Sequence, residues 1–189
     1  MKQFVISMVV CVTAVTAAGA GDVLRQLRFS KSEAEQEAVF AISVGQVPLE
    51  KLAKAFKPAP PEVKVALVEQ AMSWTKAYTS TPQFEQAYQE FRESYKPSED
   101  DAESMAQWKQ DFPAKGRDAV KKRLREFLRE SADVDYDAKL VREGGKMVFA
   151  NDAYESEKSG EWKICYRAGK EPVAKARAIA QAWLKELGG

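Results

Sequence analysis

Six residues near the C-terminal end combine aromatic and basic side chains in a way that suits ligand binding. They are Tyr154, Trp162, Lys163, Tyr166, Arg167 and Lys170. Aromatic faces beside fixed cations can bind a carbohydrate or an anionic peptide, because stacking then combines with charge-assisted hydrogen bonds. The alternative is a small satellite core in which the rings pack against basic stems. We predict that a ligand or partner contacts this segment.

A second candidate is a row of four basic residues spaced four apart, which we call the basic row: Arg117, Lys121, Arg125 and Arg129. On a helix these residues share one face, and clustered positive charge attracts polyanions such as lipid headgroups or acidic wall polymers. The alternative is a solvated face whose charges are paired within the molecule, for example with the acidic run from Glu99 to Glu103.

A third candidate is a set of alternating carboxylates, Asp133, Asp135 and Asp137, which match the first three ligand positions of a calcium loop. The match then fails, because Ala138 stands where the loop needs glycine and Gly144 occupies the twelfth position. The three aspartates can equally act as solvated caps in a turn. If a metal binds here, we expect it to brace the turn.

The sequence contains no histidine, which excludes Ser-His-Asp and Cys-His catalysis and histidine-ligated metal sites. Carboxylate chemistry remains, with one buried acid and one charged acid acting on a glycosidic bond. No motif marks such a pair among the 28 acidic residues. We therefore predict no catalytic residue and no cofactor, and we favour binding over catalysis.

The N-terminus has the order of a secretory signal peptide. Lys2 precedes an apolar run that ends in the small residues Ala18-Gly19-Ala20, and this run is too short to span a bilayer. We predict cleavage after Ala20 and export to the periplasm or the cell exterior; the alternative is that the segment stays as an anchor. Loss of Lys2 leaves acidic and basic residues equal in number, which argues against nucleic-acid binding.

Residues 21–189 have the length of one domain, and their periodicity predicts a mainly α, bundle-like fold without a transmembrane span. Capping, proline and periodicity signals place helices from Ser32 toward Val44, from Pro48, over 62–78, from Thr81-Pro82, between Pro97 and Glu130 as two helices or one kinked helix, and from Pro172. These helices must position the three candidate groups.

Weak periodicity and turn-forming pairs set the region between Asp133 and Gly160 apart. We predict short strands over 146–149 and 162–166, which would form a small hairpin. Cys165 lies in the second of these stretches, and its apolar neighbours predict a buried thiol.

These features favour an exported, non-enzymatic binding or scaffolding protein of a bacterial envelope. The expected partner is an unknown protein or a cell-envelope polymer, and the expected state is a monomer or weak homodimer. The alternative function is a small carboxylate-based hydrolase acting on cell-wall polysaccharide.

Overall fold

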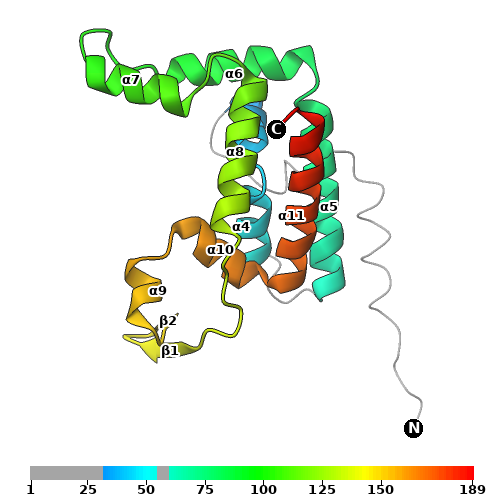
Figure 1. The fold of residues 1–189 in the computed structure, drawn as a ribbon, viewed down its shortest axis with the longest axis vertical. Helices are drawn as coiled ribbons and strands as arrows, with labels where there is room; N and C mark the ends of the chain where they lie inside the picture. Colours follow the sequence, from blue (N-terminus) through cyan, green and yellow to red (C-terminus); the bar gives the residue numbers. More distant parts are fainter. Residues whose placement is uncertain (1–31, 55–59) are drawn as a thin grey trace.

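The computed structural model describes residues 32–54 and 60–189, which form a helical domain with one small sheet (Figure 1). The predicted signal peptide, residues 1–20, lies outside the described residues. The body of the domain is a bundle of α3 (Glu33–Ile42), α4 (Gln46–Lys54), α5 (Pro61–Tyr78), α8 (Gly116–Glu130), α10 (Gly160–Ala168) and α11 (Lys170–Glu186). The predicted mainly α fold class is confirmed.

Two further parts extend from the bundle at opposite ends (Figure 1). At one end, α6 (Pro82–Ser94) lies across the ends of the bundle helices, and α7 (Ala102–Asp111) projects to one side of them. At the other end lie β1 (Leu140–Glu143), β2 (Lys146–Phe149) and α9 (Asp152–Ser156). We call residues 133–159, which carry these last three elements, the lobe.

Local signals in the sequence set the starts of α3 and α6. The Glu35 carboxylate accepts a hydrogen bond from the Ser32 amide at 3.2 Å, which completes the predicted capping box of α3. The Thr81 hydroxyl accepts one from the Phe84 amide at 3.3 Å, and Pro82 follows as the first residue of α6. Both predicted helix starts are confirmed.

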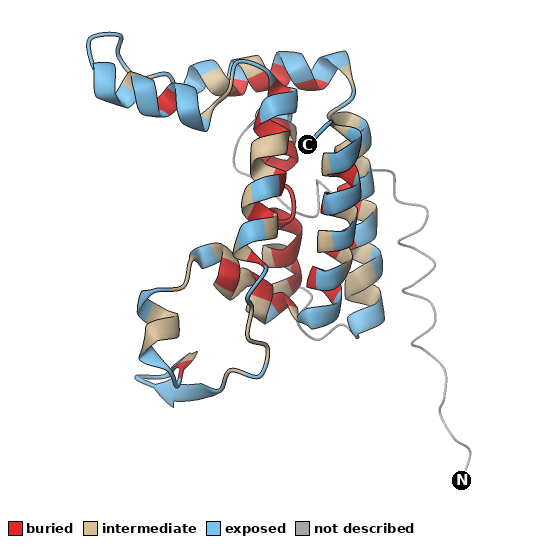
Figure 2. Ribbon diagram, viewed as in Figure 1, coloured by how far each residue is buried: buried red, intermediate tan, exposed pale blue. Residues whose placement is uncertain are grey.

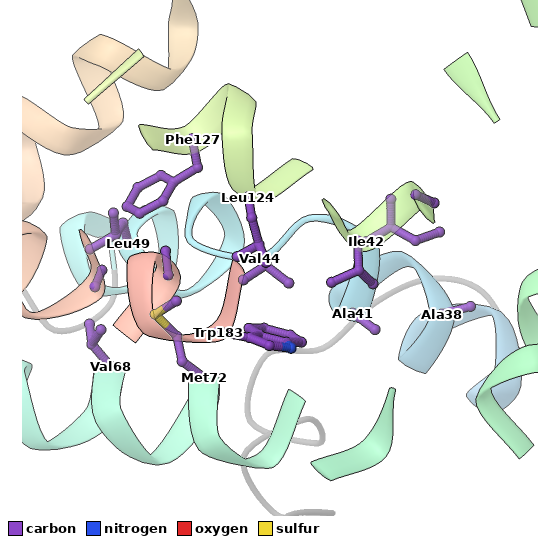
Figure 3. Packing of buried hydrophobic residues seen from close by; sticks show 14 of the residues in the cluster. Ala38, Ala41, Ile42, Val44, Leu49, Val68, Met72, Leu124, Phe127 and Trp183 are labelled. Carbon is purple, nitrogen blue, oxygen red and sulfur yellow. The ribbon is translucent and has the colours of Figure 1, made fainter. Parts of the chain in front are cut away.

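The core lies where α5 and α11 pack against the other bundle helices. Buried residues of each helix recur every three or four positions and face inward (Figure 2). Figure 3 shows the Trp183 indole lying close to Met72 and Val44, which places α11, α5 and the α3–α4 turn around one ring. No helix in the described part of the chain is long and apolar enough to cross a bilayer.

The turn between α3 and α4 brings backbone unusually close to the core. Gly45 has a φ of +82°, in the left-handed region that side chains rarely adopt. A Cβ at this position would lie 2.7 Å from the Phe127 ring. Gly45, which follows the helix predicted from Ser32 toward Val44, therefore also gives α8 room to approach α3.

Two helix boundaries differ from the predictions. The first helix predicted after Pro97 begins only at Ala102, because Asp101 accepts a hydrogen bond from the Ser104 amide at 3.0 Å and caps it. The interruption at Pro113 separates α7 from α8 completely, so two helices form rather than one kinked helix. The last helix begins at Lys170, two residues before Pro172.

A small antiparallel hairpin forms as predicted, but only one of its two strands is a predicted one. β2 covers the predicted 146–149 and pairs antiparallel with β1, with Val141 opposite Val148. The predicted strand over 162–166 is wrong, because this stretch belongs to α10. The Ser159 hydroxyl accepts a hydrogen bond from the Trp162 amide at 3.1 Å and caps that helix, whose buried residues are Trp162, Cys165 and Ala168.

Candidate functional site

Four aromatic rings pack together where the lobe meets α10. Phe149 comes from β2, Tyr154 from α9, and Trp162 and Tyr166 from α10. The Phe149 ring centroid lies 4.7 Å from that of Tyr166 and 5.5 Å from that of Trp162, both in edge-on geometry. We call these four residues the aromatic cluster. It contains three of the six predicted binding residues.

Hydrogen bonds from the aromatic cluster hold the turn that leads into the hairpin. The Trp162 indole nitrogen donates to the Asp133 carbonyl at 3.1 Å, and the Tyr166 hydroxyl donates to the Ala138 carbonyl at 2.6 Å. Trp162 is only 1% exposed, so its ring faces protein on all sides. It therefore fastens the lobe and does not offer a face to a ligand, as the satellite-core alternative expected.

Lys163 also links α10 to α9. Its ammonium group donates to the Glu155 carbonyl at 2.7 Å and to the Glu155 carboxylate at 3.1 Å. The same carboxylate accepts from the Phe149 amide at 3.0 Å. The hydrogen bonds to its carboxylate lower the pKa of Glu155, and the bond from the Phe149 amide has the largest effect. Arg167 and Lys170, the other two predicted binding residues, are exposed.

The hairpin exposes apolar side chains that the sequence analysis did not identify. Leu140 is 38% exposed, Val141 is 45% exposed and Met147 is 54% exposed. The register places Leu140 and Met147 on one face of the hairpin and Val141 on the other. One signal was available in the sequence: Gly144-Gly145 between short runs of strand-forming residues is typical of a two-residue hairpin loop.

The three predicted metal-binding aspartates make separate contacts. The Asp133 carboxylate pairs with the Lys158 ammonium at 2.6 Å, and the Asp135 carboxylate accepts from the Tyr154 hydroxyl at 3.0 Å. The Asp137 amide donates to Asp135 at 3.0 Å. In the part of the chain that the structure describes, no group of three or more possible ligands is placed to hold a metal ion.

Half of the basic row binds the end of the last helix. Arg117 donates to the Leu187 carbonyl at 2.9 Å, and Lys121 donates to the Gly188 carbonyl at 3.3 Å. Carbonyl groups at a helix C-terminus carry partial negative charge and favour cations. These two residues therefore have a structural partner within the chain.

The other half of the basic row is more open. Arg129 pairs with its neighbour Glu130 at 2.9 Å, and Arg125 is exposed. The acidic run bonds locally instead of pairing with the row: Glu99 pairs with Lys96 at 2.8 Å. Polyanion binding by the row stays a prediction, to which Arg125 can contribute most.

Cys165 lies inside the domain, as predicted. It is buried between α10 and the neighbouring helices, and burial raises the pKa of its thiol to about 12. A thiol reacts as the thiolate. Cys165 is therefore protected both by its position and by its protonation.

Glu37 is the carboxyl group that best fits the hydrolase alternative. Burial raises its pKa, a hydrogen bond from Tyr78 acts in the opposite direction, and the nearby Glu33 adds to the rise. The two carboxyls of a glycosidase face each other across the substrate. Glu33 and Glu37 lie one turn apart on α3, so this pair does not have that arrangement.

The raised pKa of Glu37 gives a prediction about stability. At pH values just above the ordinary glutamate pKa, Glu37 holds its proton more often in the folded chain than in the unfolded chain. Its contribution to the free energy of unfolding therefore falls as the pH rises through this range. Glu37→Gln removes the charged form and can still accept from Tyr78. We expect a higher thermal midpoint than the unmodified chain at pH 7 and no such gain near pH ~4. An equal gain at both pH values would show that the effect is unrelated to titration.

Comparison with known proteins identifies no relative: no protein-family model, no curated protein and no solved structure matches this chain. Its candidate surfaces therefore have to be judged by their own geometry. The lobe is the most prominent of them, because it combines a firm attachment with exposed apolar side chains.

Proposed function

We propose that this chain is an exported, non-enzymatic binding or scaffolding protein of the periplasm or cell exterior, and that it contacts its partner through the lobe. The observation that carries the proposal is the exposed hairpin, where Leu140, Val141 and Met147 face solvent. Leu140 and Met147 share one face of this projecting hairpin and Val141 lies on the other, and exposed apolar side chains that lie close together favour an interaction surface. The partner is a protein or a cell-envelope polymer.

The firm attachment of the lobe supports this function. The aromatic cluster and the hydrogen bonds of Lys163 hold the hairpin against α10 in the unbound chain. A surface that is ordered beforehand loses less conformational entropy on binding than a flexible one. Arg167 and Lys170 are exposed beside this attachment and add positive charge to the contact surface. Of the six binding residues predicted from the sequence, these two exposed cations therefore belong to the proposed contact surface.

Site-specific photo-cross-linking in the cells that produce the protein tests the proposal. We replace Met147 with a photoreactive amino acid, and as a matched control we replace Ala182, which is exposed on α11. We expect a covalent adduct at position 147 and none at position 182. Adducts at both positions, or at neither, would argue against the lobe as the contact surface.

A further inference from the structure

The outer edge of β1 has backbone groups that no other strand uses within residues 32–54 and 60–189. The Ala150 amide donates to the Lys139 carbonyl at 2.8 Å, so Lys139, Val141 and Glu143 form the hydrogen-bonded pairs of the hairpin. The amides and carbonyls of Leu140 and Arg142 then point away from β2. Such an edge can accept another strand.

The two edges of the hairpin differ in how far they are covered. At β2, the Glu155 carboxylate of the following helix accepts from the outward Phe149 amide. At β1, all four residues are exposed, and Figure 2 shows this strand at the outer margin of the lobe. A new strand therefore has access at β1.

We propose that β1 pairs antiparallel with β1 of a second copy of this chain, across a two-fold axis that passes beside Val141. This inference goes beyond the proposed function, because it assigns the β1 edge to a second copy, whereas Met147 on β2 tests the contact with the partner. Leu140 then lies opposite Arg142 of the second copy, and their outward amides and carbonyls bond to each other. The two hairpins together form one four-stranded sheet.

The charges along β1 are complementary in this arrangement. Lys139 lies opposite Glu143 of the second copy, and Glu143 lies opposite Lys139 of the second copy, so the axis generates the pair twice. Opposite charges directly across two strands stabilise pairing, and like charges destabilise it. Among the described residues, Lys139 forms no ion pair within its own chain.

The neighbouring registers lack this complementarity. Only shifts by two residues keep the outward groups of both strands in line. A shift in one direction places Arg142 opposite Arg142 of the second copy, and a shift in the other places Glu143 opposite Asp137 of the second copy. Both bring like charges together, so the sequence of β1 selects the register centred on Val141.

Apolar side chains match in the same register. Val141 lies opposite Val148 within the hairpin, and pairing adds Val141 and Val148 of the second copy to the same row. This covers a valine that is 45% exposed in the single chain. Because each strand contributes only a few residues, we expect a weak dimer that forms reversibly with concentration.

A cysteine at the axis tests the pairing directly. The sequence has two cysteines, Cys11 and Cys165. Cys11→Ser removes the first, and the second remains unreactive because it is buried. In this background we introduce Val141→Cys. Residues opposite each other at such a position lie about 4.5 Å apart between Cα atoms, within the range of a disulfide. We expect mild oxidation to give a reducible dimer on a non-reducing gel.

Met147→Cys in the same background is the matched control. Met147 is even more exposed than Val141, but it lies on β2, three strand spacings or about 14 Å from its copy. We expect it to stay monomeric under the same oxidation. Equal dimer from both variants would indicate random collision and would overturn the proposal, as would the absence of dimer from Val141→Cys.

Mixing two charge variants provides an independent test. One chain carries Lys139→Glu, and the other carries Glu143→Lys with Lys146→Glu, which preserves opposite charges across the hairpin. Each variant alone faces like charges at the interface, and the mixture restores both pairs. In sedimentation velocity, we expect each variant alone to dimerise at least ~10-fold more weakly than the mixture. Equal association of all three samples would contradict the register.

The outcomes separate this inference from the proposed function. If Val141→Cys forms no dimer and the cross-linker at position 147 captures a different molecule, the lobe binds a partner but β1 does not pair with its copy. If that cross-linker captures nothing and Val141→Cys also stays monomeric, both proposals fail.

Discussion

Trp162→Ala is expected to lower the free energy of unfolding by about 3–5 kcal/mol. Trp162 is 1% exposed and contacts three other rings of the aromatic cluster. Its removal leaves a cavity where α10 packs against Phe149 of the hairpin, and the Asp133 carbonyl loses its donor. We expect the lobe to separate from α10 while the bundle keeps its helices.

Urea denaturation gives the loss of stability, and hydrogen exchange over residues 140–149 reports the separation of the lobe. Trp162→Phe is the matched control, because it keeps an aromatic ring and loses the hydrogen bond. We expect this variant to lower the free energy of unfolding by about 1 kcal/mol more than the smaller ring alone explains, because the hydrogen bond is also lost. If Trp162→Ala leaves exchange in the hairpin unchanged, Trp162 does not fasten the lobe.

The bundle was predictable because its signals are local. The Ser32 amide donates to the Glu35 carboxylate, and the Phe84 amide donates to the Thr81 hydroxyl. Both bonds join residues three apart, so they are visible as sequence spacing. The apolar period of α11 likewise shows in the sequence, where Val173, Ala176 and Ala180 recur and become buried. Such elements need no knowledge of distant segments.

The lobe could not be predicted to the same extent. Apart from Lys163, the residues from Trp162 to Tyr166 are aromatic or apolar, which favours strand over helix in a short window. The helix forms because Ser159 caps it and because Trp162, Cys165 and Ala168 are buried together. Trp162 packs against Phe149, which comes from a strand whose partner was not identified from the sequence.

The sequence also could not show which candidate binding residues are covered by other parts of the chain. Tyr154, Trp162 and Tyr166 have the composition of a stacking site, but a stacking site and a satellite core differ only in whether a ring is left uncovered. Here the Phe149 ring fills the space between them. The exposed apolar surface consequently lies on the hairpin, where alternation in a four-residue strand is too short to reveal it.

Gly45→Ala is expected to destabilise the domain by about 2–4 kcal/mol. The backbone at Gly45 has a φ of +82°, which costs an alanine about 1–2 kcal/mol. The new methyl group would also lie 2.7 Å from the Phe127 ring, which is 3% exposed and packed in the core. The ring cannot move away without disturbing α8, so overlap adds to the backbone strain.

Gly144→Ala separates these two causes. Gly144 also has a positive φ, of +54°, but a Cβ there would meet no atom within 4 Å. We expect it to cost only the backbone strain, about 1 kcal/mol, so that urea denaturation resolves the difference. In Gly45→Ala/Phe127→Leu, the smaller side chain should relieve the overlap and make the combined loss less than the sum of the single losses. Additive losses would mean that Gly45 is needed for its backbone conformation alone and not for the approach of α8 to α3.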